Sequence, residues 1–125
     1  RRDFIHVDDV VKANLFFLDN PSKSGIFNVG TGKAGTFNDV ALTVINACRE
    51  IDGKTRLSLE DALREGLLNY FPMPDALVGK YQSYTEADIR RLNAAGFSNS
   101  FFDVEEGVDR YAAELYSRLK EGEHR

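Results

Sequence analysis

The order of apolar and polar positions in the first half of the chain predicts two strands, each followed by a helix. Phe4–Val7 and Gly25–Val29 are short runs of β-type residues. Apolar residues recur at helical spacing from about Asp9 to Leu18, and again behind Thr36 as far as about Ile51. A β-α-β-α order favours parallel strand pairing, so the pattern predicts an α/β fold.

Local signals mark the ends of these two helices. Asp8 is expected to cap the first helix, and the breaker sequence at Asn20-Pro21-Ser22 to end it. Thr36 and Asp39 form a capping box, in which a hydroxyl and a carboxylate each accept a hydrogen bond from the other's backbone N–H. The second helix is expected to end before Gly53.

Further along, the pattern predicts a smaller and mainly helical region. Leu57–Leu68 is typical of a short amphipathic helix that Ser58 can cap. The other expected elements are an edge strand at Asn69–Phe71, an ordered loop at 75–84, a helix from the capping box Thr85–Asp88 to Gly96, and a terminal helix from Asp103 to Leu119.

Composition narrows the classes of function. A chain of 125 residues corresponds to one domain or part of one, and the formal net charge of −4 argues against binding to nucleic acid or an anionic membrane. No apolar run approaches the roughly 20 residues that a membrane span needs. One cysteine, Cys48, and two scattered histidines offer neither an internal disulfide nor a metal cluster. We therefore expect a cytoplasmic protein. Because the first strand starts almost at Arg1, we also expect a piece of a longer one.

The segment Gly30–Gly35 matches the G-x-G-x-x-G pattern, follows an expected strand and precedes an expected helix. One interpretation is a dinucleotide-binding loop. The other is a turn that glycine permits in a strand-to-helix connection. The second is favoured, because the helix cap at Thr36 comes after the third glycine and too few strand signals follow for a doubly wound sheet.

Two stretches of the sequence resemble a known family. Arg2-Asp3-Phe4-Ile5-His6-Val7-Asp8-Asp9-Val10 and Phe27-Asn28-Val29-Gly30-Thr31-Gly32 resemble the C-terminal half of extended short-chain dehydrogenases/reductases, the nucleotide-sugar epimerases and dehydratases. Phe71–Asp88 and Leu92–Phe97 look like the branch that acts on ADP-heptose, and Gly79-Lys80-Tyr81-Gln82 is the most specific part. The resemblance covers essentially the whole chain.

The resemblance implies that residues 1–125 are the C-terminal substrate-binding portion of an epimerase. In that family NADP is held by an N-terminal glycine-rich loop, and a Tyr-x-x-x-Lys pair transfers protons; both belong to the part that this chain lacks. Tyr116 and Lys120 have the spacing of that pair, but they lie on the expected terminal helix and are interpreted as a chance match. We therefore expect no catalytic residue here, and a chain that is inactive alone.

The resemblance assigns substrate contacts to Arg2 and Tyr81. A guanidinium can bind a diphosphate in bidentate fashion, and a tyrosine offers a ring and a hydroxyl. The alternatives are a solvated charge for Arg2 and an ordinary packed loop aromatic for Tyr81. Lys80 and Gln82 flank the same site and are weaker candidates, whereas His6, between Ile5 and Val7, is expected to be structural.

Three hypotheses about function remain open. The first is the substrate-binding portion of an ADP-heptose epimerase that forms a homo-oligomer at full length. The second is another sugar-nucleotide epimerase or dehydratase of the same superfamily, and the third is a non-catalytic binding module.

Overall fold

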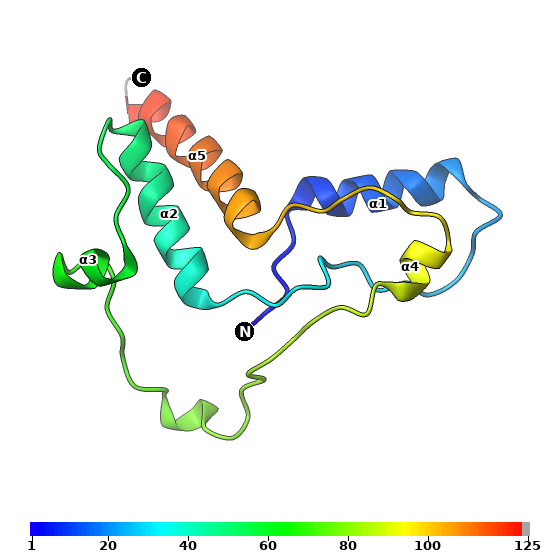
Figure 1. The fold of residues 1–125 in the computed structure, drawn as a ribbon, viewed down its shortest axis with the longest axis horizontal. Coiled ribbons are helices and arrows are strands. Elements are labelled where there is room, and N and C mark those ends of the chain that lie inside the picture. The colour runs from blue at the N-terminus through cyan, green and yellow to red at the C-terminus, as the bar shows by residue number, and fades with distance from the viewer. Residues whose placement is uncertain (124–125) are drawn as a thin grey trace.

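The computed structural model describes residues 1–123, and in this range the chain consists of helices joined by long irregular segments (Figure 1). Two of the longer helices, α2 and α5, pack along each other, and α1 lies on the opposite side of the molecule (Figure 1). The elements are α1 (Val7–Asp19), α2 (Phe37–Ile51), α3 (Leu59–Arg64), the 3₁₀ turn η1 (Asp75–Leu77), α4 (Arg90–Ala94) and α5 (Val104–Glu123).

The predicted α/β class is wrong for this chain. Within residues 1–123 there is no strand, and the β pairing consists of one isolated antiparallel bridge between Arg2 and Gly35. The segment before α1 and the segment at Gly25–Val29 have no regular secondary structure, and neither has Asn69–Phe71. β-type side chains favour a pleated surface, but a strand forms only where a neighbouring strand satisfies its backbone N–H and C=O groups.

The helices themselves largely follow the sequence pattern. The capping box at α2 is confirmed: Asp39 N–H donates to Thr36 Oγ1 (3.0 Å), and Thr36 N–H donates to Asp39 Oδ2 (2.7 Å). Ser58 caps α3 as predicted, although that helix is shorter than expected. The cap of α1 is His6 rather than Asp8, because the N–H of Asp8 donates to His6 Nδ1 (3.1 Å).

The second capping box is not formed. Helix α4 begins only at Arg90, and its N-cap residue Ile89 makes no side-chain hydrogen bond to it. Thr85 instead accepts a long hydrogen bond from Asp3 N–H at 3.4 Å, so its hydroxyl serves a contact across the chain. The predicted end of α4 is confirmed, since Gly96 follows the helix with a φ of +97°.

A hydrophobic cluster joins α1 to the region around α4. Ala13, Leu92 and Phe97 are buried at its centre, and partly buried aromatic and aliphatic side chains surround them. Next to this cluster Asp9 is fully buried; it accepts from Phe102 N–H (2.8 Å) and forms an ion pair with Lys12 (2.7 Å). These contacts attach the chain after α4 to α1.

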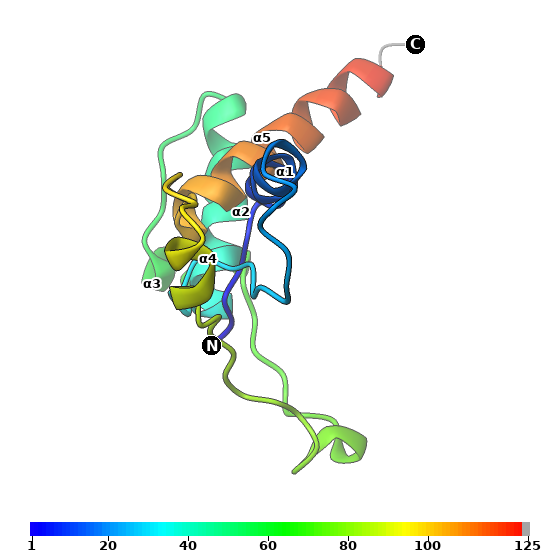
Figure 2. The same cartoon turned by 90° about the vertical axis from the view of Figure 1, so that its right-hand side faces the viewer.

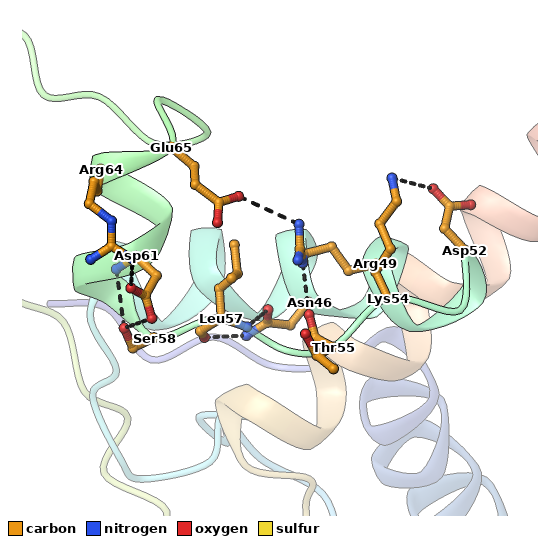
Figure 3. A network of polar contacts seen from close by, with 10 residues as sticks. All are labelled: Asn46, Arg49, Asp52, Lys54, Thr55, Leu57, Ser58, Asp61, Arg64 and Glu65. Atoms are coloured by element: carbon orange, nitrogen blue, oxygen red, sulfur yellow. Dashed lines mark hydrogen bonds and ion pairs between the residues drawn. The ribbon is translucent and has the colours of Figure 1, made fainter.

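Polar contacts connect α2 to the chain that follows it (Figure 3). The Asn46 amide both accepts from Leu57 N–H (2.8 Å) and donates to Leu57 C=O (3.0 Å), so it substitutes for a backbone partner. Arg56 lies within ion-pair distance of Glu105 and Asp109 on α5. Two acidic side chains of α5 are therefore paired with Arg56.

Candidate functional site

The candidate site begins at the N-terminal segment, whose backbone pairs with the end of the glycine loop at Gly35. Arg2 N–H donates to Gly35 C=O (2.9 Å), and Gly35 N–H donates to Arg2 C=O (2.8 Å). This pair of hydrogen bonds is the isolated β bridge of the fold. It fixes the backbone of Arg2 beside the end of the loop Gly30–Gly35.

The side chain of Arg2 extends to the long loop between α3 and α4. Its Cζ atom lies 5.1 Å from the centroid of the Tyr81 ring, and its Nη1 donates to Gln82 Oε1 at 3.2 Å. A guanidinium over an aromatic face is attracted by the ring quadrupole. The structure therefore brings together Arg2, Tyr81 and Gln82, whereas the flanking Lys80 is exposed on the same loop.

The loop that carries Tyr81 projects away from the helices (Figures 1 and 2). Phe71 has 83% of its surface exposed, and Tyr81 has 42%. Exposed aromatic rings and aliphatic groups of this density suit contact with a planar ring or with an apolar surface. The exposed large apolar residues of the loop are Leu67, Tyr70, Phe71, Met73, Leu77, Val78, Tyr81 and Tyr84.

A second feature, which we call the Asp3 clasp, lies next to Arg2. The Asp3 carboxylate accepts from Thr31 N–H (2.8 Å) and Thr31 Oγ1 (2.6 Å) through Oδ1, and from Gly32 N–H (2.9 Å) and Ala87 N–H (3.0 Å) through Oδ2. One side chain thus joins the N-terminal segment, the glycine loop and the chain that leads into α4.

These hydrogen bonds also determine the charge state of Asp3. Burial by itself would raise the pKa of the carboxyl, because it disfavours the charged form. The hydrogen bonds from Thr31, Ala87 and Gly32 outweigh burial and hold the pKa of Asp3 below its ordinary value. Asp3 is therefore an anion at neutral pH, held by hydrogen bonds rather than by a cation.

The glycine loop does not fit the pyrophosphate of a dinucleotide. Its backbone donors at Thr31 and Gly32 already bind the Asp3 carboxylate, so an incoming phosphate would meet a negative charge. Gly32 has a φ of +71°, which agrees with the predicted turn that glycine permits. No residue of this loop is assigned to a nicotinamide cofactor.

Other candidates from the sequence have structural partners. Tyr116 donates to Asp52 (3.2 Å to Oδ2), and Lys120 also contacts that carboxylate, so the pair joins α5 to the end of α2. Burial and the hydrogen bond to Asp52 raise the pKa of Tyr116. His6 caps α1, and its ring lies edge-on to Phe102 at 5.5 Å, as expected for a structural histidine.

A larger hollow of about 680 Å³ lies between the segment before α1, α2 and α5. Val44, Cys48 and Leu115 are among its lining residues, and the lining includes no lysine or arginine. This hollow therefore does not suit a diphosphate. No group of three metal-ligating side chains occurs among residues 1–123, and none of the helices there has the length and apolar character needed to cross a membrane.

Comparison with known proteins relates the chain to a class of enzymes. Residues 1–30 match the model of the NAD dependent epimerase/dehydratase family. The matched segment contains Arg2, Asp3 and the first residue of the glycine loop, Gly30. The match supports the epimerase/dehydratase superfamily, whose description names a nicotinamide cofactor, and does not distinguish one substrate from another.

Sequence reasoning missed the role of Asp3. Its hydrogen-bond partners lie 28 to 84 residues away, so no local pattern identifies them. The available signal was an acidic residue directly before a β-type run, in a chain whose glycine motif already looked wrong for a dinucleotide. An acid in that position is a candidate acceptor for unpaired loop N–H groups.

Proposed function

We propose that this chain supplies substrate-binding residues of an ADP-L-glycero-D-manno-heptose 6-epimerase. Such an enzyme inverts C6 of the heptose in ADP-D-glycero-D-manno-heptose by transient oxidation and reduction, in the synthesis of the lipopolysaccharide core precursor. The observation that carries the proposal is the contact between Arg2, Tyr81 and Gln82. This contact joins the segment that matches the family model to the loop whose sequence resembles the ADP-heptose branch.

The chemistry of this contact suits a sugar nucleotide. The Arg2 guanidinium can donate two parallel N–H groups to a diphosphate, and its planar geometry makes it selective for such bidentate partners. Gln82 and the ring of Tyr81 hold that plane in one orientation before the ligand arrives. The Tyr81 hydroxyl adds a neutral donor for a phosphate or sugar oxygen.

The cofactor in this proposal is NADP, bound by residues of the protein other than 1–125. It supplies the hydride acceptor and donor at C6 when bound. The residues of this chain bind and orient the ADP-heptose. The full-length protein works as a homo-oligomer in the cytoplasm, with neither nucleic acid nor membrane as a partner.

The test is ligand selectivity in the full natural protein, of which these 125 residues are all or a part. Calorimetric titration with ADP-heptose, UDP-galactose and GDP-mannose should give the tightest binding for ADP-heptose. Tighter binding of another sugar nucleotide would favour a different epimerase or dehydratase. Absence of binding to all three would favour a non-catalytic module.

A second measurement concerns chemistry. Residues 1–125 alone, incubated with ADP-heptose and NADP, should produce no C6 epimer detectable by NMR, because the proposal assigns hydride and proton transfer to other residues. Turnover by this chain would overturn that assignment.

A further inference from the structure

We propose that Asp3 is the positioning residue of the Arg2–Tyr81 contact, acting through its clasp on two distant loops. The inference rests on the proposed function for its ligand, a nucleoside-diphosphate sugar. Asp3 itself is not assigned to the ligand. Its part is to fix the segments that carry the residues that are.

The clasp joins three segments that are far apart in the sequence, and it adds to the Arg2–Gly35 bridge and the Thr85 hydrogen bonds between them. Through one carboxylate, Asp3 binds Thr31 and Gly32 in the glycine loop and Ala87 before α4. These four hydrogen bonds have a charged acceptor, which makes them stronger than hydrogen bonds between neutral groups. A carboxylate in this cradle takes the place that a bound anion would occupy.

The geometry around Gly30 shows that the cradle is built closely around the carboxylate. A Cβ atom at Gly30 would lie 2.7 Å from Asp3 Oδ2 and 2.5 Å from the Cβ of Ala87. Only a residue without a side chain allows the three segments to approach this far. A hollow of about 470 Å³, lined in part by Asp3, Gly30 and Ala87, lies beside the cradle.

Hydrogen bonds of Thr85, two residues before the clasp partner Ala87, anchor the backbone around Arg2. Arg2 is adjacent to Asp3, and Thr85 binds the backbone on either side of it: Thr85 N–H donates to Arg1 C=O (3.2 Å) and Thr85 Oγ1 accepts from Asp3 N–H (3.4 Å). Tyr81 is separated from this anchored stretch by three residues. The clasp adds its hydrogen bond to Ala87 to these anchors, so its loss should loosen the loop and let the Tyr81 ring move off the guanidinium.

The experiment replaces the carboxylate and then returns it in solution. In the full natural protein, Asp3→Ala should weaken ADP-heptose binding by about tenfold, which corresponds to about 1.4 kcal/mol. Sodium formate, which carries the missing carboxylate, should restore most of the affinity, whereas sodium chloride at equal ionic strength should not. Asp39→Ala is the matched control, since it removes the carboxylate of the α2 capping box; it should lower the melting temperature, with affinity nearly unchanged and no response to formate.

A readout without substrate keeps the inference separate from the proposed function. The Tyr81 ring should displace the NMR signals of the Arg2 side-chain protons in wild type. Asp3→Ala should abolish this ring-current shift, and formate should return it. If Asp3→Ala does not fold, Asp3→Asn serves instead; its amide fills the cradle, so it should lose the shift without any rescue by formate.

Two results separate the possible failures. An unchanged ring-current shift in folded Asp3→Ala or Asp3→Asn would overturn the positioning role, even if the melting temperature falls. Failure of wild type to bind ADP-heptose or any other sugar nucleotide would overturn the proposed function, while the ring-current measurement still decides the role of Asp3.

Discussion

Two loops of this chain differ in how well their sequence motif indicates the contacts that they make. The loop Gly30–Gly35 has the letters of a dinucleotide fingerprint, yet its donors at Thr31 and Gly32 bind the carboxylate of Asp3. The stretch at 75–84, expected only as a loop, carries Tyr81 and Gln82, which contact Arg2. The backbone donors of the first loop are satisfied by Asp3. The second loop projects away from the helices (Figure 2), and its aromatic side chains are exposed.

The difference shows that a glycine motif offers anion binding only while its N–H groups remain available. A phosphate site needs donors that point at the ligand and no competing acceptor. In this chain the competitor is in the sequence itself, immediately before the first β-type run. The second loop, in contrast, has large side chains that remain exposed, and a ligand can contact them.

The largest effect on ligand binding is expected at Arg2, whose side chain contacts the exposed loop. Loss of a charged hydrogen bond to phosphate costs about 1.5–3 kcal/mol, so Arg2→Ala in the full natural protein should weaken ADP-heptose binding by roughly 10- to 150-fold. Calorimetry should show this with NADP affinity and melting temperature close to wild type. A sharp fall in melting temperature with intact substrate affinity would make Arg2 structural.

A change in the loop Gly30–Gly35 should lower the free energy of unfolding. Gly30→Ala inserts a Cβ into the Asp3 clasp, and overpacking of this kind typically costs about 1–3 kcal/mol. Urea unfolding measures the loss. Gly122→Ala is the control, because Gly122 lies in α5 with nothing near its Cβ position; this change should stabilise by about 0.5–1 kcal/mol. Equal effects at the two glycines would contradict the close packing of the clasp.

A smaller effect is expected at Tyr81. Tyr81→Phe keeps the ring that faces the guanidinium and removes only the hydroxyl, so ADP-heptose binding should weaken by about fivefold, the equivalent of one neutral hydrogen bond. Titration of this variant beside Arg2→Ala tests the order. A larger loss at Tyr81→Phe would mean that the sugar, rather than the diphosphate, dominates recognition.

The last prediction is a gradual response to acid. Because the pKa of Asp3 is lowered in the folded chain, its stabilisation is present above the unfolded pKa of about 3.9 and is lost as the pH falls through the folded value. The difference in free energy of unfolding between wild type and Asp3→Asn should be constant near neutral pH and shrink in acid. A difference that does not change with pH would show that Asp3 ionisation contributes nothing to the clasp.

Local features of the fold were predictable to the extent that they depend on neighbours in the sequence. The capping box Thr36/Asp39, the Ser58 cap and the end of α4 at Gly96 all involve residues within one helical turn, and all are observed. The second capping box failed because Thr85 bonds to Asp3, 82 residues away, and a distant partner of that kind leaves no trace in the local pattern.

The sequence by itself determined where the main helices form, since apolar spacing and caps act over a few residues. Arg2 and Tyr81 were candidates through the resemblance to the epimerases, and the structure places the two side chains in contact. Only the tertiary structure decided that the β-type runs stay unpaired here and that the glycine loop is closed by Asp3. Both outcomes depend on which backbone donors and acceptors meet across the chain, and hydrogen-bond partners far apart in sequence are fixed by packing rather than by local preference.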